Sequence, residues 1–244
     1  MIDIHCHILS GLDDGAGDLQ VSVDMARMAY EDGIRHIVAT PHFFGKYVTA
    51  PGTILEKIEQ LRLELQRERI GITITPGNEV RLESAAFVYE HDKEGNFFYL
   101  DPGRRFVLLE QPWERYCDDS EEVFQWFLSR GTTPIIPHPE RHAFFREQPE
   151  LLYRLMDMGA WTQVTVDSLI GRNGKAAETF SRRLLERDQI HVLATDAHNT
   201  SRKPNLSEGF RLLNLMAGAE RSQQILDRME SIRRTIVADS AAAL

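Results

Sequence analysis

The sequence of 244 residues contains few cysteines and no long hydrophobic run. Its two cysteines, Cys6 and Cys117, cannot form a disulfide framework, and such sparse use of cysteine is typical of a reducing compartment. No apolar run is long enough to cross a bilayer, and the chain does not open with a basic segment followed by an apolar one. We therefore expect a cytoplasmic protein without a signal peptide and without a membrane span.

The sequence also lacks an excess of basic residues. Lysine and arginine together number 28, against 37 aspartates and glutamates, which gives a net charge of −9. This balance argues against nucleic-acid backbones and anionic membranes as the main partners. A local cluster of cationic side chains could still bind a phosphate group.

Several motifs for hydrolysis or phosphate binding are absent as well. A cysteine phosphatase needs an arginine at a fixed short distance after its cysteine, and the corresponding positions here are Leu12 and Val123. The glycine-rich segment 11–17 has neither the spacing nor the Lys-Ser/Thr pair of a nucleotide phosphate loop. No Gly-x-Ser-x-Gly sequence occurs. These absences argue against cysteine phosphatases, nucleotide-binding folds and serine hydrolases of that type.

Short apolar runs alternate with amphipathic segments, which is typical of βα units around a parallel sheet. We expect strands at residues 2–5, 34–40, 72–75, 106–109, 134–136, 161–166 and 190–195. Helices are expected from about 18, 53, 119, 149, 175 and 205, with Thr53 and Glu56 as a capping box. Residues 80–105 are the least regular part, and a short strand is considered at 235–237. Seven strand–helix repeats without a linker predict one α/β domain over residues 1–244, closed into a barrel related to the (β/α)₈ design.

Ionisable side chains that bind metals follow six of the seven expected strands. The pair His5 and His7 lies on one face of the first strand, because side chains alternate along a strand. In a parallel barrel the carboxyl ends of the strands converge on the active site. The residues that reach this end are His5, His7, Asp13 or Asp14, His42, Glu79, Glu110, His138, Asp196 and His198.

Nitrogen and carboxylate ligands without thiolate favour Mn²⁺, Fe²⁺, Co²⁺ or Zn²⁺. One ion usually takes about four to six ligands, so this set predicts two or three ions. Clustered divalent ions are the usual apparatus for phosphoester hydrolysis, because they activate water and stabilise the attacking and leaving oxygens. Arg141 and Arg202 would complete such a site by binding the phosphate. A surface ion pair is the alternative for each arginine.

Six motifs together resemble the PHP (polymerase and histidinol phosphatase) superfamily. They are Ile2-Asp-Ile-His-Cys-His7, Asp13-Asp-Gly15, Ala39-Thr-Pro-His42, Pro76-Gly-Asn-Glu79, His138-Pro-Glu-Arg141 and Asp196-Ala-His-Asn199. Within the superfamily the sequence is most similar to the bacterial protein-tyrosine-phosphatase branch, which is linked to capsular and exopolysaccharide synthesis. The resemblance extends from residue 1 to about residue 215.

The resemblance implies a distorted (β/α)₇ TIM-like barrel with a metal centre that is usually Mn²⁺ dependent. It implies hydrolysis of phosphotyrosine by metal-activated hydroxide, with the C-terminal tyrosine cluster of a bacterial tyrosine kinase as substrate. The implied ligands are His5, His7, Asp14, His42, Glu79, Glu110, His138, Asp196 and His198, with Asp13 an equal candidate for Asp14. Arg141 matches the family's phosphate-binding arginine. The proton for the leaving tyrosinate would come from His42 or from a metal-bound water.

Two positions depart from the family pattern. The second phosphate-binding arginine is expected where this chain has Lys203, with Arg202 just before it; lysine cannot make the planar bidentate contact. Asp167 would be unfavourable near a phosphate unless it is turned away or paired. Two alternative functions stay open: hydrolysis of histidinol phosphate or another small phosphomonoester, and a catalytically weak metal-binding regulatory protein.

Overall fold

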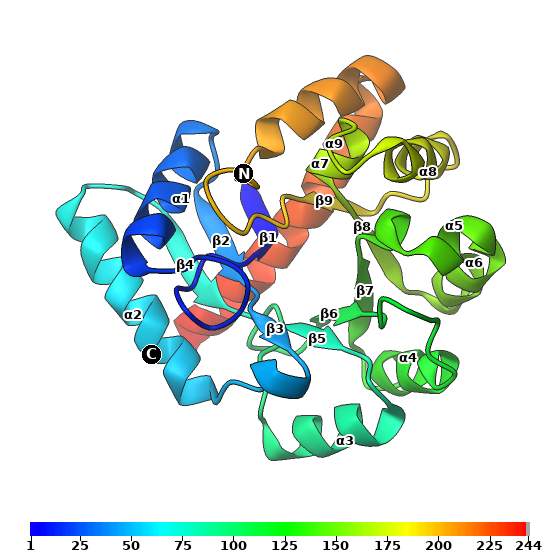
Figure 1. The fold of residues 1–244 in the computed structure, drawn as a ribbon, viewed down its shortest axis with the longest axis horizontal. Helices are drawn as coiled ribbons and strands as arrows, with labels where there is room; N and C mark the ends of the chain where they lie inside the picture. The colour runs from blue at the N-terminus through cyan, green and yellow to red at the C-terminus, as the bar shows by residue number, and fades with distance from the viewer. Residues whose placement is uncertain (243–244) are drawn as a thin grey trace.

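The computed structural model describes residues 1–242, in which helices surround a central set of parallel strands (Figure 1). The strands are β1 (Ile2–Cys6), β2 (His36–Ala39), β3 (His42–Phe43), β4 (Thr73–Pro76), β5 (Glu79–Arg81), β6 (Phe106–Glu110), β7 (Thr133–Pro137), β8 (Trp161–Thr165) and β9 (Val192–Ala194). The helices are α1 (Leu19–Glu31), α2 (Pro51–Arg67), α3 (Ala85–Glu94), α4 (Ser120–Leu128), α5 (Ala143–Glu147), α6 (Pro149–Met158), α7 (Val166–Leu169), α8 (Lys175–Glu186) and α9 (Leu206–Ala242). The 3₁₀ helices Gly45–Tyr47 and Pro139–Arg141 complete the set.

The strands form two parallel sheets, and the chain passes directly from one sheet to the other at two points. One sheet has the order β1-β2-β4 and the other the order β3-β5-β6-β7-β8-β9. Only two residues separate β2 from β3, and only two separate β4 from β5, so the chain bends from one sheet into the other at each point. At the second bend a Cβ on Gly77 would lie 2.6 Å from Cγ1 of Val38, which explains the glycine there. The α/β fold with parallel sheets is confirmed.

Backbone hydrogen bonds also connect the first strand to the chain that follows the last one. The amide of His7 donates to the carbonyl of Ala197 at 2.8 Å, and the amide of Asp196 donates to the carbonyl of His5 at 2.9 Å. These contacts bring the two ends of the strand series together. Closure of all strands into a single seven-stranded barrel stays a prediction.

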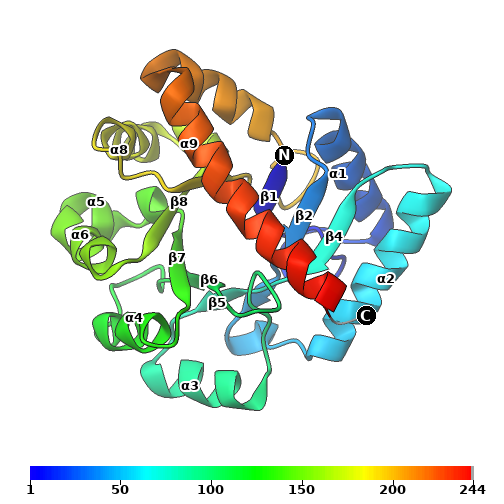
Figure 2. The same cartoon turned by 180° about the vertical axis from the view of Figure 1, so that it is seen from behind.

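The long helix α9 covers the amino ends of the strands and bends at Gly218, where φ is 84°. Figure 2 shows its second half crossing over β1, β2 and β4. The strand considered at 235–237 was wrong, because Met229, Ile232 and Ile236 are buried at helical spacing. This apolar stripe outweighs the β-branched residues around it.

Two further expectations about helices were wrong. Helix α2 begins at Pro51, with Ala50 and no capping side chain before it, so Thr53 and Glu56 form no capping box. Pro51 at the first helical position fixes the start of the helix.

The expected irregular stretch 80–105 contains β5 and helix α3. Ser84 caps α3 by accepting a hydrogen bond from the amide of Phe87 at 3.1 Å, and Gly95 ends the helix with φ at 69°. Both capping residues are visible in the sequence, but the weak apolar periodicity between them hid the helix.

Within the described residues, no helix is long and apolar enough to span a membrane.

Candidate metal centre

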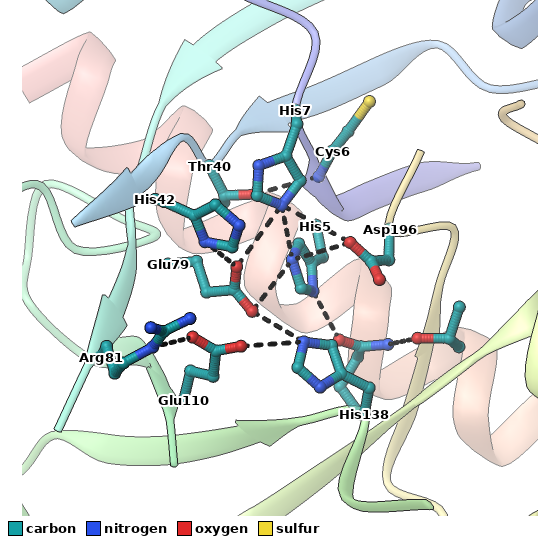
Figure 3. Close-up of polar contacts among 12 residues, drawn as sticks. His5, Cys6, His7, Thr40, His42, Glu79, Arg81, Glu110, His138 and Asp196 are labelled. Carbon is teal, nitrogen blue, oxygen red and sulfur yellow. Dashed lines mark hydrogen bonds and ion pairs between the residues drawn. The ribbon is translucent and has the colours of Figure 1, made fainter. Parts of the chain in front are cut away.

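The candidate ligands gather at the carboxyl ends of the strands (Figure 3). Seven of the nine side chains are buried, His42 is 11% exposed, and Asp14 is 56% exposed. Their ligand atoms form four overlapping groups, each within 4.8 Å: His7-Asp14-His42-His198, His5-His7-Asp196, His5-Glu79-His138 and His42-Glu79-Glu110. All nine residues of the predicted set therefore belong to one continuous cluster.

His5, on β1, and His7, just after β1, face each other through their Nε2 atoms. Their Nε2 atoms lie 3.1 Å apart, while Nδ1 of His5 donates to Oε1 of Gln163 at 2.7 Å and Nδ1 of His7 donates to Oδ2 of Asp13 at 2.7 Å. With both Nδ1 atoms protonated, each neutral ring presents a lone pair at Nε2. Two facing lone pairs repel unless a cation lies between them, so this pair fits a metal ion.

Without a metal ion, a proton can take that place. Burial lowers the pKa of His7, but the carboxylates of Asp13 and Glu79 together outweigh burial and raise this pKa to about 9. Metal ligands must be deprotonated, so an ion that binds here displaces a proton.

Glu79 lies at the centre of the cluster. Its Oε1 is 2.8 Å from Nε2 of His138 and 3.4 Å from Nε2 of His5. Its Oε2 is 2.7 Å from Nδ1 of His42 and 3.4 Å from Nε2 of His7. Burial alone would raise the pKa of Glu79, but the surrounding histidines hold it well below its usual range. Glu79 therefore faces four of the candidate ligand histidines and would help to hold a metal centre from its middle.

The structure separates the roles of the two neighbouring aspartates. Asp13 accepts hydrogen bonds from His7, from the amide of His42 at 3.0 Å and from the amide of Gly15 at 2.9 Å. Asp14 instead places Oδ1 3.3 Å from Nε2 of His42 and 3.5 Å from Nε2 of His198. Asp14 therefore lies in the ligand cluster, while Asp13 orients His7 from behind.

Two candidate ligands have a left-handed backbone, which residues other than glycine rarely adopt. The φ angles are 36° for His138 and 51° for Asp196. The amide of His138 donates to the carbonyl of Gln163 at 2.8 Å, and the amide of Asp196 donates to His5. These hydrogen bonds hold both residues at the point where the strand turns toward the cluster.

Both predicted arginines contact one oxygen of Asp196. Arg141 donates to Oδ2 at 2.5 Å and Arg202 donates to the same atom at 2.8 Å. The other oxygen, Oδ1, lies 3.4 Å from Nε2 of His5 and 3.5 Å from Nε2 of His7. Lys203 lies elsewhere, in a surface depression beside α1 that it shares with Asp32. Arg202, and not Lys203, therefore stands at the cluster.

Asp167 is paired and does not compete with a phosphate. Its Oδ1 accepts a hydrogen bond from Asn205 at 2.8 Å and forms an ion pair with Arg172 at 3.1 Å. Asp167 thereby connects α7 to the start of α9, which accounts for an acidic residue at this position.

Two residues near the cluster were not predicted from the sequence. Gln163 lies on β8, which corresponds to the one strand of the seven expected from the sequence that was given no ligand. Its side chain orients His5. Arg81 donates through Nε to Oε2 of Glu110 at 2.8 Å. Its signal was present, because Arg81 follows Glu79 by two residues and side chains alternate along a strand.

Comparisons with known proteins identify the family to which the chain belongs. The family model for the capsular polysaccharide synthesis proteins CpsB/CapC matches residues 1–232. The tyrosine-protein phosphatase YwqE of Bacillus subtilis is 38% identical over 236 residues, which cover 96% of this chain and 92% of YwqE. The putative tyrosine-protein phosphatase CapC of Staphylococcus aureus is 28% identical over 205 residues, which cover 84% of this chain and 79% of CapC.

Solved structures show the same relationship. A chain from the crystal structures of YwqE from Bacillus subtilis and CpsB from Streptococcus pneumoniae, unique metal-dependent tyrosine phosphatases, has a TM-score of 0.89 and 37% identity. The match covers 96% of this chain and 95% of that chain. The phosphotriesterase homology protein from Escherichia coli, with a TM-score of 0.51 and 11% identity, shares the fold alone. The resemblance inferred from the six motifs is confirmed, and the chain belongs to the CpsB/CapC family of capsular polysaccharide synthesis proteins.

Proposed function

We propose that this chain is a metal-dependent protein-tyrosine phosphatase. The observation that carries the proposal is the cluster of nine ligand side chains with two arginines beside it, in a chain 38% identical to a tyrosine-protein phosphatase. The substrate is a phosphotyrosine protein, and a bacterial tyrosine kinase that controls capsule or exopolysaccharide synthesis is the proposed partner. The two buried, unpaired cysteines support a cytoplasmic location.

We assign His5, His7, Asp14, His42, Glu79, Glu110, His138, Asp196 and His198 as ligands of two or three divalent ions, with Mn²⁺ preferred over Fe²⁺, Co²⁺ or Zn²⁺. The donor set contains only nitrogen and oxygen, because Cys6 is turned toward the carbonyl of Ala197. When bound, such ions activate water and stabilise charge on the phosphoryl oxygens.

The two arginines supply the phosphate recognition in this proposal. Arg141 is 23% exposed and Arg202 is 38% exposed, so both guanidinium groups reach the surface of the cluster while they contact Asp196. Their charge would neutralise the phosphate as negative charge grows in the transition state. Tyrosinate needs little help as a leaving group, because its conjugate acid has a pKa of about 10.

We place His42 among the ligands and not as the proton donor. Its Nδ1 faces Glu79 at 2.7 Å and its Nε2 faces Asp14 at 3.3 Å, so both ring nitrogens are directed at carboxylates. Burial lowers the pKa of His42, but these carboxylates outweigh burial and raise it to about 11.

The test is an activity panel on purified protein that has been stripped with a chelator and reloaded. Phosphotyrosyl peptide, phosphoseryl peptide and histidinol phosphate are each assayed with Mn²⁺, Co²⁺, Fe²⁺ and Zn²⁺. We expect hydrolysis only after metal is restored, with the highest kcat/KM for phosphotyrosine. A higher kcat/KM for histidinol phosphate would assign a small-molecule phosphatase, and no hydrolysis with any metal would leave a regulatory metal-binding protein.

A further inference from the structure

Arg81 lies beside Glu110 at the edge of the cluster (Figure 3), and two neighbours hold its side chain in place. It lies opposite Glu110 in the register of β5 and β6, and its Nε donates to Oε2 of Glu110 at 2.8 Å. Its Cζ lies 3.3 Å above the centre of the Phe44 ring. The side chain is only 14% exposed, so this guanidinium is fixed and largely removed from water.

The contact with Arg81 leaves Glu110 with one available oxygen. Oε1 of Glu110 is buried and has no hydrogen-bond partner among the described residues. This atom lies 3.8 Å from Nε2 of His138, and Glu110 forms a ligand group with Glu79 and His42. The Glu110 carboxylate therefore directs a single oxygen toward the candidate metal ligands and gives the other to Arg81.

We propose that Arg81 is a positioning residue that fixes Glu110 as a one-oxygen metal ligand. The inference rests on the metal centre of the proposed function. A guanidinium suits this role because its plane stacks on Phe44 while Nε sets the direction of the hydrogen bond. Its positive charge also offsets the approach of two buried carboxylates, Glu79 and Glu110.

Phe44 is part of the same arrangement. It follows the ligand His42 by two residues in an extended backbone, with φ at −167°, and its ring centre lies 5.2 Å from that of His42. The ring therefore lies between the ligand on β3 and the arginine on β5. Removal of the ring would free the guanidinium without changing its charge.

The test measures metal binding and not turnover. Chelator-stripped protein is titrated with Mn²⁺ in a calorimeter, and bound manganese per chain is measured after gel filtration. We expect Arg81→Gln to weaken the affinity of the ion next to Glu110 by about 10- to 100-fold and to lower the bound manganese by about one ion per chain. Arg81→Lys and Phe44→Leu should each cause a smaller loss, because the positive charge beside Glu110 remains in both variants and only the stacked guanidinium geometry is lost.

Arg104→Gln is the matched control. Arg104 also pairs an aromatic ring with a carboxylate, since its Cζ lies 5.1 Å from the Tyr99 ring centre and its Nη1 lies 3.6 Å from Asp92. Arg104 lies away from the nine ligands, so this variant should bind manganese like the wild type. Thermal melting of the stripped proteins checks that each variant folds; if Arg81→Gln does not, Arg81→Lys and Phe44→Leu decide the question by the same titration.

A double variant tests whether Arg81 acts through Glu110. Arg81→Gln combined with Glu110→Gln should bind manganese no more weakly than Glu110→Gln alone. Additive losses, or wild-type affinity in Arg81→Gln, would overturn the inference and leave the metal centre in place. A wild-type protein that binds no ion would instead overturn the proposed function.

Discussion

The two ends of the strands use histidine in opposite ways. At the carboxyl ends, five histidines face the carboxylates of Asp14, Glu79, Glu110 and Asp196. At the amino ends, His36 is buried and His191 is half-buried, both close to arginines of α9. His36 is hydrogen-bonded to Oγ1 of Thr75 at 2.8 Å, and Nδ1 of His191 accepts from the amide of Thr162 at 3.1 Å.

Neighbouring charges shift the pKa of the amino-end histidines and the pKa of His42 in opposite directions. Burial lowers the pKa of His36 and of His191, and neighbouring arginines lower it further, to about 4 for both. Glu79 and Asp14 have the opposite effect on His42, whose pKa rises despite burial. At the amino ends, His36 and His191 are therefore neutral structural residues, whereas the five histidines at the carboxyl ends belong to the candidate metal cluster.

The largest effect on kcat should come from the substitution of one candidate ligand in the cluster. We expect His138→Ala to lower kcat for a phosphotyrosyl peptide by about a thousandfold or more, equivalent to about 4 kcal/mol, while the protein still folds. His36→Gln, at the other end of the strands, should keep wild-type kcat. Mn²⁺-dependent hydrolysis and thermal melting are measured for both. Wild-type turnover by His138→Ala would remove this residue from the site.

Acid should destabilise the protein through the amino-end histidines. The folded pKa of about 4 lies below the unfolded value of about 6.5, so the unfolded chain binds protons first as the pH falls. Stability is then lost between about pH 6.5 and pH 4, by up to about 3 kcal/mol per histidine. Urea unfolding of the wild type and of the double variant His36→Gln/His191→Gln measures the difference. Parallel pH profiles for the two proteins would contradict this assignment.

Substitution of the two arginines beside the cluster should lower activity less than substitution of a candidate ligand. Arg141→Lys and Arg202→Lys should each lower kcat/KM for phosphotyrosyl peptide by about 10- to 100-fold, because lysine keeps the charge but loses the planar contact. Lys203→Met should leave kcat/KM unchanged, since Lys203 lies beside α1. A loss for Lys203→Met that equals the loss for Arg202→Lys would reverse the assignment.

The smallest effect is expected from a substitution of Gln163, which contacts the candidate ligand His5 but is not itself a candidate ligand. Gln163→Leu removes the acceptor for Nδ1 of His5, so the ring is no longer held with Nε2 free. Manganese affinity should fall by about tenfold, with little change in the melting temperature of the stripped protein. Unchanged affinity would show that His5 is oriented without Gln163.

The sequence predicted which side chains gather in the cluster better than it predicted the residues that orient them. Each ligand follows an apolar run, and the convergence of parallel strand ends then brings residues as distant as His5 and Asp196 together. The choice between Asp13 and Asp14 could not be predicted in this way. It depends on the turn at Gly15, where a Cβ would lie 2.2 Å from the carbonyl oxygen of His7.

The choice between Arg202 and Lys203 depends on a loop in the same manner. Oδ1 of Asn199 accepts hydrogen bonds from the amides of Ser201 and Arg202, at 2.8 and 2.9 Å, and this turn directs Arg202 to Asp196. Helix α3 was missed for a different reason, since its only fully buried side chain is Val88 and little periodicity results. Local sequence patterns therefore left two features undetermined. These are the direction of side chains in tight loops and the presence of weakly amphipathic helices.

The central position of Glu79 has a thermodynamic consequence for the proposed centre. Ions that share one carboxylate cannot bind independently, because the first ion fixes the orientation and charge of a ligand that the next one needs. Occupancy should therefore respond to metal concentration as a coupled equilibrium, in which the loss of one ion alters the affinity for its neighbours. We therefore expect the proposed centre to take up its ions as one coupled unit through Glu79.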